Sequence, residues 1–149
     1  MGNKPLMIFI PLLFIAAVVG TYFFYNQYKL DNTKTEVMKD GRLRIVYPYS
    51  DGGFYFNFHI TDEGVIQKSA TTQVGQANDC KQGAVFSAAA EGRTDIYTVW
   101  TTDPVSKDYQ AELFHVTVDS SLKISYKSER ISVSDYVKAT GQDLLGFTY

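Results

Sequence analysis

The hydrophobic pattern of the chain begins with an apolar stretch, residues 6–25, that contains no charged side chain. About 20 helical residues, each rising roughly 1.5 Å, cross the hydrocarbon core of a bilayer. The stretch ends in the aromatic residues Tyr22, Phe23, Phe24 and Tyr25, and aromatic rings prefer the headgroup level of a membrane. The pattern therefore predicts a short cytoplasmic end and a single transmembrane anchor within residues 1–25.

Two other interpretations of this stretch are open. A cleaved signal peptide would use Lys4 as its basic end and the small residues at 18–20 as its cleavage site. The aromatic run beyond Gly20 favours an uncleaved anchor instead. A buried core helix is disfavoured, because so long a charge-free run at the N-terminus is typical of a membrane span.

The charges that flank the apolar stretch predict its orientation. Lys4 precedes it, whereas Lys29 follows it with Asp31 close by. The small positive excess favours a cytoplasmic N-terminus. In a Gram-negative cell we therefore expect a single-pass protein of the inner membrane, with its C-terminal domain in the periplasm.

The pattern changes after the anchor. Residues 26–40 are polar and predict a stalk, and residues 41–149 predict a domain of short strands. In the clearest strand Phe54, Phe56, Phe58 and Ile60 share one face, because side chains alternate along a strand. About eight short strands are predicted, and those before the C-terminal tail lie at residues 42–49, 54–61, 65–72, 84–90, 95–102, 110–118, 122–127 and 129–134.

Closely spaced strands joined by turns predict a mainly β, antiparallel fold, either a barrel or a sandwich. The barrel would be of the up-and-down type. We expect the first three strands to form a meander. Ser134 and Asp135 are expected to begin a short helix that ends at Gly141, and residues 144–149 are expected to return as an edge strand.

Composition narrows the function classes. The 149 residues carry a net charge of −2, with 14 Lys and Arg against 16 Asp and Glu, so no basic surplus indicates nucleic-acid binding. The chain has two histidines and one cysteine, without metal-ligand spacing, and no nucleophile motif is present. We therefore expect a non-enzymatic protein with no catalytic residues, metal or cofactor.

Aromatic residues on the strands have two interpretations. Phe54, Phe56, Phe58 and Trp100 are core residues in the simpler one. In a closed barrel of about eight strands the same inward faces line a pocket for a small apolar ligand.

Three further side chains are candidates for regulation. His59 and His115 lie on predicted strands, and their charge changes between about pH 5 and pH 8, so either is a candidate pH-responsive group at a partner interface. Cys80, the one cysteine, lies in the polar segment QANDCKQG. It is either an unpaired thiol or the site of an intermolecular disulfide.

The segments KDGRLRI and YSDGGFYFNFHI predict a hairpin that follows the stalk. With the short N-terminus, single span and β-domain, this layout resembles the small periplasmic partner proteins of ToxR-like transmembrane regulators, the ToxS- and PsaF-like proteins. The resemblance is one of layout and carries no functional residue. It implies a protein that binds and stabilises a membrane-bound transcription factor, with a lipocalin-like barrel and bile-type ligands in some relatives.

The sequence thus predicts a membrane-anchored periplasmic protein that pairs with a single-span sensor or regulator in the bilayer. Residues 42–49 and 144–149 are the expected edge strands for pairing. The alternatives are an accessory component of a secretion, pilus or envelope complex, and a periplasmic immunity or inhibitor protein.

Overall fold

The computed structural model describes residues 17–21, 34–49, 55–74, 80–103, 105 and 108–144. The chain divides into two units, residues 1–33 and 34–149. In the first unit, residues 17–21 are helical and the Thr21 hydroxyl donates to the Ala17 carbonyl at 2.8 Å. A search of the described residues finds no helix with the length and hydropathy of a membrane span. Most of the predicted anchor and the stalk up to residue 33 lie outside the described residues.

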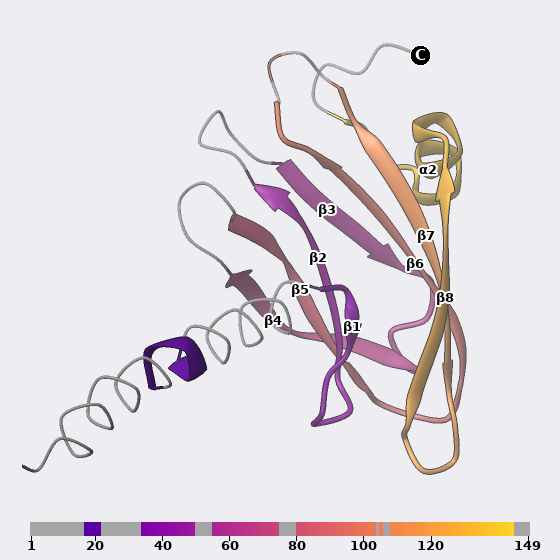
Figure 1. Cartoon of the computed structure of the whole chain (residues 1–149). Helices are drawn as coiled ribbons and strands as arrows, with labels where there is room; N and C mark the ends of the chain where they lie inside the picture. Colours follow the sequence, from indigo (N-terminus) through magenta and orange to yellow (C-terminus); the bar gives the residue numbers. More distant parts are fainter. Residues whose placement is uncertain are drawn as a thin grey trace, which may run out of the picture. The chain divides into compact units, whose positions relative to one another are not determined.

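The described part of the second unit is mainly β, as predicted (Figure 1). Its elements are β1 (Glu36–Val37), β2 (Leu43–Tyr49), β3 (Tyr55–Ile60), β4 (Ile66–Val74), β5 (Cys80–Ala88), β6 (Gly92–Thr101), β7 (Gln110–Val118), β8 (Ile124–Ile131) and α2 (Val133–Thr140). The unit begins at Lys34, so residues 34–40 of the predicted stalk belong to the domain. The two last predicted strands are one strand, β8.

The strands form two antiparallel sheets, ordered β1-β2-β5-β4 and β3-β6-β7-β8. The domain is therefore a sandwich, and the alternative of a closed barrel, lipocalin-like or otherwise, is wrong for the described strands. The physical reason lies in the pairing: no described ladder joins β3 to β4 or β1 to β8, so each sheet keeps two terminal strands.

The predicted meander of β2, β3 and β4 is also wrong. β2 pairs with β5, and β3 pairs with β6 in the other sheet. The reason is packing across the sandwich, where the ring of Tyr47 on β2 stacks on Trp100 of β6 with centroids 3.7 Å apart. β1 pairs with Leu43 and Arg44 of β2, so the prediction that residues 42–49 form an edge strand is wrong for the start of this strand.

The main core fills the space between the two sheets. Leu43, Ile45 and Phe86 from one sheet are fully buried against Ile96 and Phe114 from the other. A second apolar cluster lies on the opposite face of the β3-β6-β7-β8 sheet, where α2 covers part of that face. Tyr136 of α2 is its largest fully buried side chain.

Capping residues fix both ends of α2. The Ser132 hydroxyl accepts a hydrogen bond from the Asp135 backbone N–H at 3.0 Å, and Gly141 adopts the left-handed conformation with φ of 65°. The predicted end at Gly141 is confirmed, whereas the predicted start is two residues late because Ser132, not Ser134, is the N-cap. Leu144 is buried outside any strand, and residues 145–149 of the predicted edge strand lie outside the described residues.

Candidate functional site

The strand β3 is a terminal strand whose edge carries a local block, a hydrogen bond of 2.9 Å from the Phe58 N–H to the Asn57 side-chain oxygen. It pairs with β6 alone among the described strands. Its sequence, YFNFHI, contains no formally charged residue at neutral pH, no proline and no register shift. Exposed edges usually carry charged residues, prolines or bulges, because their unpaired backbone groups can otherwise pair with a strand of another chain. The aromatic strand β3 is therefore the strongest candidate for a contact with another chain.

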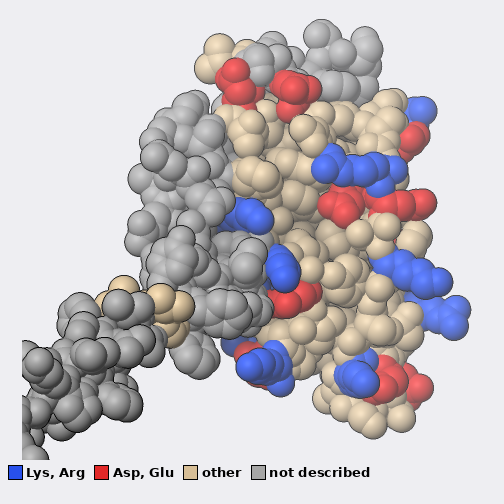
Figure 2. Space-filling model, viewed as in Figure 1, with Lys and Arg blue, Asp and Glu red and all other residues tan. Residues whose placement is uncertain are grey.

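Two of the other terminal strands of the described sheets, β8 and β4, carry features that protect an edge. β8 carries Lys127, Glu129 and Arg130, and Figure 2 shows charges of both signs on the side of the molecule where β8 runs. β4 contains a register shift between Lys68 and Ala70. A bulge of this kind twists an edge and disrupts pairing.

The two faces of β3 behave as the sequence pattern predicts. Phe56, Phe58 and Ile60 pack toward the core between the sheets. The Phe58 ring meets Phe86 of β5 edge to face, with centroids 5.2 Å apart. Phe54 lies outside the described residues. The inner face of β3 thus belongs to the core, although Phe56 and Phe58 are only half-buried.

The outer face of β3 is fixed by the C-terminal part of the chain. Asn57 Nδ2 donates to Gln142 Oε1 at 2.8 Å, and the Tyr136 hydroxyl of α2 donates to the same oxygen. Tyr55 meets Tyr109 edge to face at 5.6 Å. These contacts hold β3 from the side opposite the core, so its edge is presented by a fixed strand.

An open depression of about 370 Å³ lies beside β3, between the two sheets. Phe56 and Phe58 line it together with Lys68, Thr71 and Gln82. Lys68 Nζ lies 5.5 Å from the centroid of the Phe58 ring, within reach of a cation–π contact. Two residues of the predicted ligand pocket therefore border a depression, and the binding of an apolar ligand stays a prediction.

Trp100, the fourth residue predicted for that pocket, is a core residue instead. Its side chain is 3% exposed and does not line the depression. It stacks on Tyr47, and the guanidinium carbon of Arg130 lies 4.6 Å from the ring centroid. Trp100 therefore does not border this depression, because Tyr47 and Arg130 lie against its ring.

The polar residues of the depression are not predicted by the sequence pattern. Lys68 and Thr71 have the wrong spacing for one face of a regular strand, since side chains alternate with a period of two. The register shift after Lys68 inserts one extra residue, so that Lys68 pairs with Phe86 while Thr71 pairs with Ala84. Nothing in the local sequence marks the position of this bulge.

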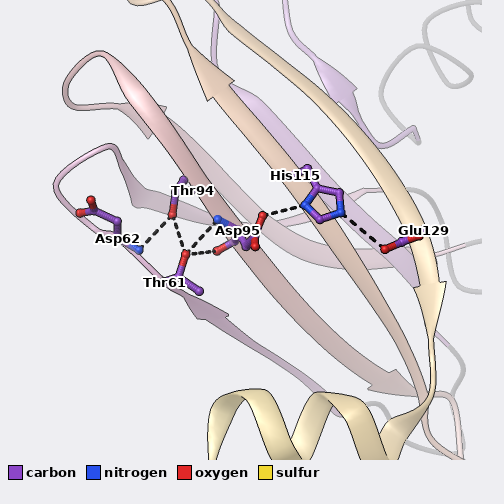
Figure 3. A network of polar contacts seen from close by, with 6 residues as sticks. All are labelled: Thr61, Asp62, Thr94, Asp95, His115 and Glu129. Atoms are coloured by element: carbon purple, nitrogen blue, oxygen red, sulfur yellow. Dashed lines mark hydrogen bonds and ion pairs between the residues drawn. The ribbon is translucent and has the colours of Figure 1, made fainter.

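Both histidines lie on the β3-β6-β7-β8 sheet, on its outer face. In register, His59 is opposite Tyr97, and His115 is opposite Asp95 in the next row. Figure 3 shows the imidazole of His115 between Asp95 and Glu129. Nδ1 lies 2.8 Å from Asp95 Oδ1, and Nε2 lies 3.5 Å from Glu129 Oε1. The structure thus gives His115 two carboxylate partners.

The carboxylate partners favour the charged form of His115. Its hydrogen bond with Asp95 raises the pKa of His115 above the ordinary histidine value, and the Glu129 carboxylate acts in the same direction. Asp95 lies on β6, beside the end of β3. Its backbone N–H donates there to the Thr61 hydroxyl at 2.9 Å (Figure 3). The ring is half exposed, so the effect on stability is small.

Asp95→Asn is expected to lower the pKa of His115, because the carboxylate that favours imidazolium is removed. A raised folded-state pKa gives stability that is fully present below the unfolded pKa and is lost as pH rises through the folded pKa. NMR titration of the His115 ring and urea unfolding at about pH 5 and about pH 8 measure both effects. His59→Gln is the control and should leave the His115 titration unchanged. An unaltered His115 pKa in Asp95→Asn contradicts the assignment.

The remaining candidates for site chemistry are a metal-binding group and the Cys80 thiol. No three His, Cys, Asp or Glu residues in the described part of the chain are grouped to hold a metal ion. Cys80 begins β5 and pairs with Tyr49 in the sheet, but its side chain lies outside what the structure describes. The intermolecular disulfide therefore stays a prediction.

Comparison with known proteins found no matching family model, curated protein or solved structure. The resemblance to partners of ToxR-like regulators therefore stays a prediction.

Proposed function

We propose that this chain is a non-enzymatic protein of the inner membrane whose periplasmic β-sandwich pairs with a single-span sensor or transcription regulator. The partner would contribute an extended segment that adds to β3. The observation that carries the proposal is the character of this edge: six residues without formal charge at neutral pH, proline or bulge, at the end of a four-stranded sheet. Strand addition obtains its affinity from backbone hydrogen bonds and its specificity from alternate side chains.

The geometry around β3 supports an added strand in two ways. The half-buried rings of Phe56 and Phe58 border the depression beside the edge, so a partner side chain entering there would bury more apolar surface. On the outer face, the Asn57 amide is already held by Gln142. A strand that is fixed before binding loses less conformational entropy when a partner adds to it.

The predicted anchor supplies the other half of the proposal. Two proteins that each span one bilayer meet at a high effective concentration, so a modest edge-to-edge contact is sufficient for pairing. We infer that the apolar residues 6–25 hold the domain at the membrane and that β3 selects the partner.

Photo-crosslinking at the edge tests this function. A photoreactive amino acid replaces His59 on β3 or, as the matched control, Thr117 on β7. Both residues lie on the outer face of the same sheet, but β7 is flanked by β6 and β8. We expect a membrane-embedded, single-span protein to be captured at position 59 and not at position 117, in intact cells and with the full chain.

Four results would count against the proposal. Equal capture at both positions contradicts strand addition at β3. Capture of secretion or pilus components at position 59 favours the alternative of an envelope-complex accessory, and capture of a periplasmic enzyme favours an inhibitor. Recovery of the chain in the soluble fraction without residues 1–20 contradicts the anchor.

A further inference from the structure

The segment that precedes β2, residues 34–37, lies along the edge of that strand. In β1, Glu36 pairs with Arg44 and Val37 pairs with Leu43. The ladder continues into the turn, where the Met38 N–H donates to the Arg42 carbonyl at 2.8 Å. Residues 34–37, which we call the strap, thus belong to the same sheet as β2.

A buried arginine fastens the start of the strap. Arg44 is 5% exposed, and its Nε donates to the Lys34 carbonyl at 3.1 Å. Its Nη2 lies 2.7 Å from Glu36 Oε1. Charge-assisted hydrogen bonds are stronger than neutral ones, so the guanidinium holds both the backbone and a side chain of the strap against β2.

Thr35 fastens the strap to both sheets. Its hydroxyl accepts from the Val46 N–H at 3.1 Å and donates to the Val46 carbonyl at 3.3 Å, in the manner of a further residue of β1. Its own carbonyl accepts from the Tyr126 hydroxyl of β8 at 2.9 Å. The strap therefore connects β2 in one sheet to β8 in the other.

The β2 edge is blocked in three different ways, two by the strap and one by a residue of β2 itself. In an antiparallel ladder the backbone groups of alternate residues point to the same side. Arg44 is covered by the β1 backbone, and Val46 is covered by the Thr35 side chain. Next in this alternation is Pro48, which has no N–H to donate. Each position from Arg44 to Pro48 that faces outward is thus unsuited to an incoming strand.

We propose that the strap is a built-in guard of the β2 edge: it occupies this edge within the chain and prevents β2 from pairing with β2 of a second copy. Released β2 edges are identical in two copies and can pair antiparallel about a twofold axis, as isologous contacts do. The inference does not rest on the proposed function, because it concerns this chain alone.

The test removes two hydroxyls that hold the strap, in the full chain in detergent micelles. The variant Thr35→Val with Tyr126→Phe keeps shape and apolar area. The control, Thr117→Val with Ser125→Ala, removes two hydroxyls from exposed positions of β7 and β8, where the Ser125 hydroxyl donates to the Thr117 carbonyl and not to the strap. Hydrogen exchange at the Val46 amide reports release of the strap, and light scattering reports the dimer fraction.

We expect the Val46 amide to exchange about tenfold faster or more in the strap variant, since each lost hydrogen bond is worth on the order of 1 kcal/mol. The dimer fraction should rise above that of the unaltered chain and the control. If the variant proves unfolded by circular dichroism, Tyr126→Phe alone carries the same test with a smaller effect. Unchanged Val46 protection overturns the strap, and faster exchange without dimers overturns its role as a guard.

Discussion

Replacement of Trp100 by alanine is expected to lower the free energy of unfolding by about 3–5 kcal/mol, the range for large aromatic residues removed from a core. Trp100 is 3% exposed, stacks on Tyr47 with an interplanar angle of 13°, and carries Arg130 over its ring. Its removal leaves a cavity between the sheets that rigid strands fill poorly. Urea unfolding followed by far-ultraviolet circular dichroism measures the loss, because the variant lacks the chain's one tryptophan.

Phe58→Ala is the matched control for this prediction. Phe58 is half-buried and borders the open depression beside β3, so water can occupy part of the space that its ring leaves. We expect a loss of about 1–2 kcal/mol, below the range for a fully buried ring. Equal losses for the two variants would contradict the assignment of Trp100 to the core and of Phe58 to the rim.

Gly83→Ala is expected to destabilise the domain by about 3 kcal/mol or more, near the upper range for overpacked sites. Gly83 lies in β5 between β2 and β4, paired with Val46 and Thr72. A Cβ at this position would lie 2.8 Å from the Ile45 carbonyl carbon and 2.9 Å from Val46 Cα, and closer still to the Ile45 carbonyl oxygen. These are backbone atoms, so the two strands would have to separate.

The control for Gly83→Ala is Ser87→Ala in the same strand, which removes one hydroxyl from a partly exposed position. A change within about 0.5 kcal/mol is expected there. The two unfolding curves should differ in midpoint. A Gly83→Ala domain as stable as the Ser87→Ala domain would show that β2 and β5 tolerate separation, contrary to the close approach in the structure.

Local signals in the sequence predicted much of the secondary structure. The alternation in YFNFHI assigned Phe56 and Phe58 to one face of β3 and His59 to the other, because strand side chains have a period of two. Gly141 marked the end of α2, because few other residues adopt a positive φ at low cost. These features depend on a few neighbouring residues and therefore survive without knowledge of the fold.

The choice of strand partners could not be predicted in the same way. The turn between β2 and β3 suggested a hairpin, yet these two strands lie in different sheets. Tyr47 of β2 stacks across the sandwich on Trp100 of β6, the neighbour of β3. The burial of Arg44 beneath the strap and the bulge next to Lys68 depend likewise on which strands meet. Such long-range contacts are set by the packing of the whole core.

By itself, the sequence determined that the chain contains an apolar segment of bilayer length followed by a domain of short antiparallel strands. Only the tertiary structure decided that the described strands form a sandwich, that the β2 edge is covered at Arg44 and Val46, and that β3 is a terminal strand among them. The reason is that periodicity is a local property of a chain. Whether an edge is exposed, in contrast, depends on how all the other strands of the domain are paired.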